Sequence, residues 1–309
     1  MAVITTAQGR CWRYSHYVGR RSTAGMGFTQ PVGVAIDKEG VVFVANRTST
    51  RITKATIDQE FITEFGRGGN AEGQFTYLTD VALDKDGNVY TSDEWLNRIT
   101  VFDNDGNLIK VWGEAGEGEG QLNGPSSMAF DADDNVWIVN SLNSRIQKFT
   151  RDGKYLTSFG TKGDGAGDLD MPWGITVDNN GDIYVADWNN HRIQKFDTAG
   201  NHLTTFGSGV KTGVATDGGT PYSHHFEAHV PVNPRNLNHP TGVAVDGDGD
   251  VYVVDWMNER VVIFNQDGKT VATLRGDASG LSKWAQLSAD ANPDMVKARE
   301  RLKNPEVQN

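Results

Sequence analysis

The chain has 309 residues with a formal net charge of −11, and 37% of the residues are hydrophobic. This composition is typical of one compact globular domain, and it disfavours nucleic-acid binding because an acidic protein repels a phosphate backbone. The sequence predicts no membrane span, because it has no stretch of about 20 apolar residues. An internal disulfide is excluded, since Cys11 is the single cysteine.

The first segment, residues 1–27, has no apolar core of the length that a signal peptide needs. Together with the single cysteine, this favours a cytoplasmic location. Within the segment, Cys11–Val18 is predicted to be an outer β-strand, although no inner strands precede it. Four arginines (Arg10, Arg13, Arg20 and Arg21) leave a local basic patch open.

Five copies of one phrase follow, each an apolar run that ends in aspartate. The first reads PVGVAID from Pro31, and the last reads PTGVAVD from Pro240. The closing aspartates are spaced by 47, 47, 47 and 68 residues, at Asp37, Asp84, Asp131, Asp178 and Asp246. A fixed period of this size is typical of a repeat architecture.

Each repeat predicts four short strands. An apolar inner strand comes first, and a turn rich in Asp, Gly and Asn leads to a β-branched and aromatic second strand, as in Val136–Val139. A polar turn precedes the third strand, which starts with arginine, and a second Asp/Gly turn precedes the outer strand, as in Tyr155–Phe159. Four-stranded units repeated radially form a β-propeller.

The motifs resemble the NHL repeat family, whose signature is P-x-G-V-A-V-D followed by D-x-x-N-x-R-I. The segment Asp187–Ile193 (DWNNHRI) is a close match, and the resemblance covers about residues 28–275. It implies a propeller, usually of six blades, around a central channel. Two repeats depart from the pattern, with Leu78–Asp80 in place of Pro-x-Gly and Ser127 at the glycine position.

The predicted fold is therefore all-β, a single propeller domain over residues 1–309 with five complete blades over 28–275. The unpaired N-terminal strand predicts a partial sixth blade, as in a truncated six-bladed ring. A closed five-bladed ring, or an edge covered by a helix or another molecule, stays open as an alternative. Residues 276–309 are predicted to be a tail with a short helical segment, because residues 281–303 have helical composition.

The fourth spacing is longer because the connection at 208–236 is 21 residues longer than its siblings. We expect this insert beside the channel mouth, where it would be a lid or binding loop. It contains His224, His225, Glu227 and His229, which could supply zinc or calcium ligands; an ordinary polar loop is the favoured interpretation. No cofactor is assigned. Amidating lyases of the NHL class use channel histidines with zinc, but the sequence lacks their pattern.

Residues that break the repeat symmetry are the better candidates for binding. Asp80 stands at a glycine position beside the channel mouth, where a carboxylate could hold a cation or act as a base. Trp173 replaces Val, Thr or Ser, and Trp95, Trp188 and Trp256 lie in neighbouring turns. Tryptophans on a polar face can form stacking platforms for sugars or apolar ligands. Packing under the insert explains them equally well.

Residues that keep the symmetry are expected to be structural. A short polar side chain begins each turn between the second and third strands and can cap it. We also expect the arginine that follows each turn to bind carbonyls or carboxylates between blades. The two sets are Asn46, Asp93, Asn140, Asp187 and Asp255, and Arg51, Arg98, Arg145, Arg192 and Arg260.

Three function classes follow from the sequence. The favoured one is a propeller that binds a small molecule, protein or peptide on the channel-mouth face with the insert. The second is a metal-assisted lyase or a lactonase-like hydrolase with its site in the channel mouth. The third is a structural scaffold that recruits a partner through an open blade edge. The sequence contains no nucleophile motif, so the choice between an enzyme and a binding protein stays open.

Overall fold

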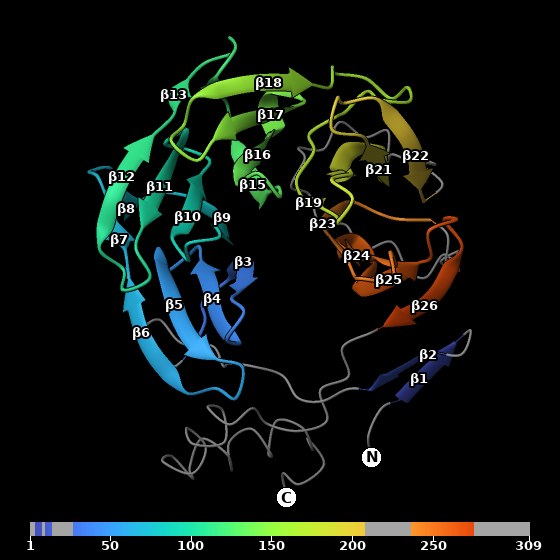
Figure 1. Cartoon of the computed structure of the whole chain (residues 1–309), viewed down its shortest axis with the longest axis horizontal. Helices are drawn as coiled ribbons and strands as arrows, with labels where there is room; N and C mark the ends of the chain where they lie inside the picture. The colour runs from blue at the N-terminus through green and yellow to red at the C-terminus, as the bar shows by residue number, and fades with distance from the viewer. Residues whose placement is uncertain (1–3, 8–9, 14–26, 208–235, 275–309) are drawn as a thin grey trace, which may run out of the picture.

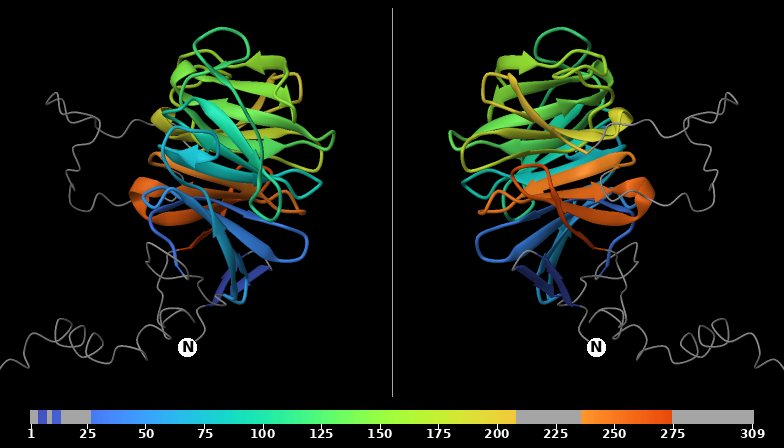
Figure 2. Two further views of the ribbon diagram at one scale, coloured as in Figure 1. Left: turned by 90° about the vertical axis from the view of Figure 1, so that its left-hand side faces the viewer. Right: turned by 90° about the vertical axis from the view of Figure 1, so that its right-hand side faces the viewer.

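The computed structural model describes residues 4–7, 10–13, 27–207 and 236–274. Five four-stranded antiparallel sheets are arranged radially as the blades of a propeller (Figure 1). Figure 2 shows the ring from the side, with the sheets stacked face to face. The all-β propeller predicted from the repeats is therefore confirmed. Of the described residues, none forms a helix with the length and hydropathy of a membrane span.

In every blade the chain runs from the innermost strand to the outermost, and neighbours in sequence are neighbours in the sheet. The strands of blades one and two are β3 (Pro31–Ile36), β4 (Val41–Asn46), β5 (Arg51–Thr56) and β6 (Phe61–Phe65), then β9 (Leu78–Leu83), β10 (Val89–Asp93), β11 (Arg98–Phe102) and β12 (Leu108–Trp112). Those of blade three are β15 (Pro125–Phe130), β16 (Asn135–Asn140), β17 (Arg145–Thr150) and β18 (Tyr155–Phe159).

Blade four consists of β19 (Ile175–Val177), β20 (Ile183–Asp187), β21 (Arg192–Phe196) and β22 (His202–Phe206). Blade five consists of β23 (Pro240–Val245), β24 (Val251–Asp255), β25 (Arg260–Phe264) and β26 (Thr270–Leu274). Short parallel pairs lie in two connections between blades, β7 (Arg67–Gly68) with β8 (Gln74–Phe75) and β13 (Glu114–Ala115) with β14 (Gln121–Leu122).

The aspartate that closes each repeated phrase forms the turn between the first two strands. In blade two, Asp84 accepts hydrogen bonds from the backbone N–H groups of Asp86 and Asn88 at 3.0 and 2.8 Å. The same oxygen accepts from the second and fourth following residues in the other four blades. The repeated aspartate is thus explained by turn formation.

The hydrophobic core lies between blades rather than within one sheet. One cluster fills each of the four interfaces from blade one to blade five. Large aromatic side chains from the second strands are buried there, among them Phe43, Tyr90, Trp137 and Tyr184. Burial on both faces explains why these strands read as continuous apolar runs in the sequence.

A hydrogen bond that recurs in every blade holds the incoming connection in place. The polar side chain that ends the second strand accepts a backbone N–H from the residue 17 positions earlier, at 2.6–2.9 Å, in all five blades. The donors are Thr29, Thr76, Asn123, Asp170 and Asn238, and the acceptors are Asn46, Asp93, Asn140, Asp187 and Asp255. We call this hydrogen bond the latch.

The repeated arginine reinforces the latch. Arg192 donates to the carbonyls of Asp164, Gly165 and Asp168 in the connection, and its Nε lies 2.8 Å from Asp187 Oδ2. Arginines in the other blades also bind carbonyls of the incoming connection. Architectural roles for the aspartate and arginine sets agree with this geometry. The aspartates, however, reach the preceding connection and do not act only within their own turn.

The described part of the ring is open between blades five and one. Inner strands of successive blades pack together from β3 to β23, but β23 and β3 make no comparable contact. A two-stranded hairpin, β1 (Ile4–Ala7) and β2 (Arg10–Arg13), lies beside β26 (Figure 1). The expected strand over Cys11–Val18 coincides with β2 as far as Arg13, and its remainder lies outside the described residues.

Several expectations therefore stay predictions. The partial sixth blade and the exact domain limits are not settled by a hairpin beside one blade. The helical segment at 281–303 and nearly all of the insert at 208–236 lie outside the described residues.

Candidate functional site

The latches define one face of the propeller, which we call the latch face. In each blade the turn between the second and third strands meets the incoming connection there, as the antiparallel order of the strands requires. In blades three to five this turn is a short 3₁₀ helix, namely η1 (Ser141–Asn143), η2 (Trp188–Asn190) and η3 (Trp256–Asn258). Each 3₁₀ helix ends at a residue with positive φ. Gly207 and Asn236, the described residues on either side of 208–235, both lie on this face.

Asp80 lies on the inner strand β9 and reaches the next blade. Its Oδ2 accepts a hydrogen bond from Ser127 Oγ at 2.7 Å and from the backbone N–H of Met128 at 3.0 Å, while Oδ1 accepts from the N–H of Val81. A Cβ on Gly33 would come within 2.3 Å of Asp80 Oδ1. The two residues that depart from the repeat pattern, Asp80 and Ser127, therefore form one hydrogen-bonded pair. Gly33 of blade one leaves room for the carboxylate.

The carboxyl group of Asp80 has an altered acidity. Burial raises the pKa of Asp80 to about 6, against the opposing effect of the hydrogen bonds from Ser127, Met128 and Val81. A carboxyl group with such a pKa exchanges protons near neutral pH, which general base chemistry requires. The arrangement thus supports the base role foreseen for Asp80 and equally a bridging role between blades two and three.

Three of the four candidate tryptophans form a continuous stack. The ring of Trp173 lies 5.5 Å from that of Trp188 and 6.5 Å from that of Trp256, with interplanar angles of 16° and 26°. Trp256 comes from blade five, and the other two come from blade four. Trp256 is 44% exposed, while Trp173 and Trp188 are partly buried. We call these three residues the tryptophan strip.

Two histidines extend the tryptophan strip at Trp188. The His239 ring lies 4.3 Å from Trp188 and 4.3 Å from His191, and its backbone N–H donates to His191 Nδ1 at 3.1 Å. Burial, assisted by repulsion from His191, lowers the pKa of His239 to about 4. His239 is therefore neutral at physiological pH. The sequence does not indicate this pairing, because the two histidines are 48 residues apart in the chain.

Trp95 lies apart from the strip, in blade two. It stacks on Tyr77 at 4.9 Å and 7°, and the guanidinium of Arg47 lies 4.2 Å from the centre of the Tyr77 ring. Arg47 also donates to the Tyr77 hydroxyl at 3.1 Å. Trp95 is 65% exposed, so one side of this second stack faces solvent. Tyr77 and Arg47 were not foreseen, because neither belongs to a repeated motif.

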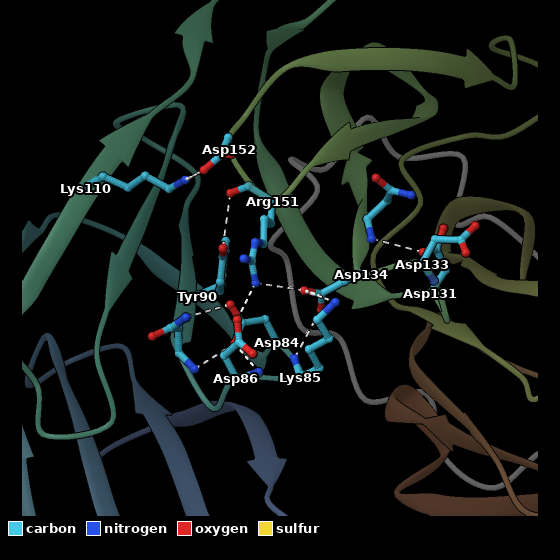
Figure 3. A network of polar contacts seen from close by, with 12 residues as sticks. Asp84, Lys85, Asp86, Tyr90, Lys110, Asp131, Asp133, Asp134, Arg151 and Asp152 are labelled. Carbon is cyan, nitrogen blue, oxygen red and sulfur yellow. Dashed lines mark hydrogen bonds and ion pairs between the residues drawn. The ribbon is translucent and has the colours of Figure 1, made fainter.

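A group of three carboxylates on the opposite face is paired with two cationic side chains. Carboxylates of Asp84, Asp86 and Asp134 gather between the first turns of blades two and three. Arg151 Nη1 lies 2.5 Å from Asp86 Oδ2 and 3.1 Å from Asp134 Oδ2 (Figure 3). The Lys85 ammonium adds a second cation 3.6 Å from Asp134. Two of the three carboxylates are thus paired with Arg151.

The predicted metal ligands His224, His225, Glu227 and His229 lie outside the described residues, so the zinc or calcium hypothesis stays a prediction. Within the described ranges, only the Asp84, Asp86 and Asp134 group brings three potential ligands together. The latch face therefore has two aromatic stacks as candidate binding elements, and the Asp80 carboxyl group between blades two and three is a third candidate.

Comparison with known proteins places the chain in a family. A model described as the SMP-30/gluconolactonase/LRE-like region matches residues 5–220, and the NHL repeat model matches residues 237–264. The chain belongs to the SMP-30/gluconolactonase/LRE-like family. The match over 237–264 confirms the NHL resemblance inferred from the repeats. No curated protein matches this member of the family.

Solved structures share the fold of this SMP-30/gluconolactonase/LRE-like chain at low identity. Virginiamycin B lyase from Staphylococcus aureus is 16% identical with a TM-score of 0.55, covering 84% of this chain and 73% of the lyase. A streptogramin B lyase is 14% identical with a TM-score of 0.56, covering 82% and 72%. A chain of the nidogen/laminin complex is 18% identical with a TM-score of 0.61, covering 89% and 93%. At these identities the similarity shows the fold alone.

Proposed function

We propose that the protein is a binding propeller whose ligand contacts the tryptophan strip on the latch face. One observation carries the proposal: Trp173, Trp188 and Trp256 stack across two blades at positions where the other repeats have no common aromatic residue. The five latches keep the symmetry of the ring, whereas the strip breaks it. A site for one ligand requires such an asymmetry.

The chemistry of the strip favours a flat or ring-shaped ligand. Indole faces bind sugars and aromatic rings by dispersion and burial of apolar surface, and a partly exposed Trp256 can still gain contact area. The neutral His239 adds an uncharged polar ring beside Trp188. A small molecule, or an aromatic side chain of a peptide, fits this surface.

A titration with p-nitrophenyl β-glucoside tests the strip, because this probe carries both an aromatic ring and a sugar. Trp173→Ala removes the central ring of the strip and should weaken binding roughly tenfold or more. Trp95→Ala is the matched control, since it removes an exposed tryptophan from the other stack. Equal affinities for the two variants, or no binding by the wild-type protein, would count against this use of the strip.

The long connection is the second element of the proposed site. Deleting residues 210–232 should leave the propeller folded, because surface insertions are thermodynamically tolerated, and should abolish binding of the probe. Binding by the deletion variant as strong as that of the wild-type protein would show that the insert plays no part. Loss of folding would instead indicate that two aromatic residues of the insert, Tyr222 and Phe226, belong to the core.

A metal-assisted lyase or lactonase-like hydrolase is the second candidate. Membership of the SMP-30/gluconolactonase/LRE-like family and the raised pKa of Asp80 favour it. The test combines metal analysis of untagged protein with hydrolysis of gluconolactone by wild type and Asp80→Asn. Stoichiometric zinc or calcium together with Asp80-dependent turnover would establish the enzyme, and absence of turnover would leave the binding function. The scaffold class and the cytoplasmic location remain predictions.

A further inference from the structure

Among the described residues, no blade packs against one face of β3, the inner strand of blade one. Val34 is 62% exposed, whereas the residues at the same position of blades two to four, Val81, Met128 and Ile175, are buried against the preceding blade. Ile36, two residues further along the same face, is 56% exposed. This face of β3 therefore lacks the packing partner that the other inner strands have.

The fifth blade shows the same defect on its opposite face. Val254 is 44% exposed, whereas the equivalent residues of the first four blades are fully buried against the following blade. Those residues are Ala45, Ser92, Val139 and Ala186. Ala244 on the adjacent strand β23 is also exposed. Two apolar surfaces thus flank the open part of the described ring, one on the inner strand of blade one and one on the first two strands of blade five.

The exposure is confined to the inner half of each surface. Val42, Val44 and Ala55 share the face of Val34 and are buried, as are Ile263 and Ala272 on the outer half of blade five. The β1–β2 hairpin lies beside the outer strand β26. What the gap lacks is a layer about as deep as two inner strands, roughly 5–10 Å at the usual strand spacing.

The chain has a segment that can reach this layer. β26 ends at Leu274 beside the gap, and residues 275–280 (RGDASG) form a glycine-containing spacer. Crossing from the outer strand to the inner strand of a blade requires about 15 Å, and six extended residues span about 20 Å. The next residues place Leu281, Trp284 and Ala285 at the i, i+3 and i+4 positions of an amphipathic helix.

We propose that the segment starting at Leu281, within residues 281–303, docks by its apolar face between β3 and β24. It substitutes for the missing inner strands and covers Val34 and Val254. Attachment at Leu274 gives the segment a high effective concentration at the gap, which favours it over a second copy of the chain. This inference concerns closure of the ring and is independent of the ligand proposed for the tryptophan strip.

Cysteine labelling provides the test in the full chain. In a Cys11→Ser background, Val254→Cys reports on the gap, and Leu142→Cys is the matched control because Leu142 is 51% exposed in blade three. Docking predicts that a bulky maleimide labels Cys at position 254 roughly tenfold more slowly than Cys at position 142. Adding Leu281→Asp and Trp284→Asp should raise the rate at position 254 to that of the control.

Equal labelling rates at the two positions in the otherwise unaltered chain would overturn the proposal, whether or not the aspartate variant folds. Protection that disappears on dilution would also overturn it, because a second copy would then cover the gap. Protection that is independent of concentration and lost with the two aspartates would establish docking of the chain's own segment.

Discussion

Asp80 is the residue whose chemistry departs furthest from its place in the repeat. Four blades have glycine or serine there, and the carboxylate of Asp80 bridges to Ser127 and Met128 instead of pointing into free space. Its folded-state pKa of about 6 exceeds the ordinary value of 3.8. The folded protein therefore binds a proton more tightly than the unfolded chain, so ionisation of Asp80 lowers stability as pH rises from 4 toward 6 and above.

Asp80→Asn should remove this dependence while keeping a hydrogen-bond acceptor. The stability of the variant relative to wild type is expected to increase by about 2 kcal/mol between pH 4.5 and pH 7.5. Urea unfolding at the two pH values measures the change. A difference between the two proteins that is the same at both pH values would contradict the raised pKa.

His239 should show the opposite sign. Its folded-state pKa of about 4 lies below the ordinary value of 6.5, so its contribution to stability is present above pH 6.5 and is lost as pH falls toward 4. His239→Gln should therefore gain about 2–2.5 kcal/mol relative to wild type between pH 7 and pH 4.5. The same urea measurements apply, with His202→Gln as a control outside the histidine pair.

At the scale of the single element, the latch explains why one short polar residue recurs in every blade. Asp187 is fully buried and accepts from the N–H of Asp170, from Asn190 and Gln194, and from Arg192. Burial nevertheless raises the pKa of Asp187, which shows that the charge is costly at this position. Blades one and three use Asn46 and Asn140 instead, so an amide can make the essential hydrogen bond.

Asp187→Ala should destabilise the protein by about 3–5 kcal/mol, because it leaves Arg192 buried without its carboxylate. Asp187→Asn should cost far less, since it copies blades one and three. Thermal or urea unfolding distinguishes the two variants, and Asp197→Ala in an exposed outer turn of the same blade is the control. Similar losses for Ala and Asn would show that the negative charge itself is required.

The sequence predicted the repeated elements well, because their periodicity is local. The four strands per blade follow from apolar runs and Asp/Gly turns within each repeat. The latch was read as a local cap, since a partner 17 residues upstream cannot be recognised before the blade is assembled. The tryptophans show the same limit: Trp95 stands two residues after its latch aspartate, whereas Trp188 and Trp256 stand one residue after theirs. The stack of Trp173 on Trp256 depends on the angle between two blades.

At the scale of the whole molecule, the described part of the ring has two terminal blades and three internal ones. Repeat arrays gain stability from interfaces between neighbours, so a terminal unit with one such interface opens more readily. Hydrogen exchange should therefore be slowest in β16 of blade three and roughly tenfold or more faster in β4 and β24. A uniform rate across the second strands of all blades would indicate cooperative opening of a closed ring.

Because the latch always spans 17 residues, the length of a connection does not affect the geometry of the blade that follows it. Asn238 meets Asp255 just as Asp170 meets Asp187, although the connection before Asn238 carries 21 additional residues. The latch captures only the last residues before the inner strand, so the chain upstream can vary without shifting the blade. Each connection is thus a modular insertion point. A foreign loop grafted upstream of Asn123 should be displayed on the latch face, with blade three left in register.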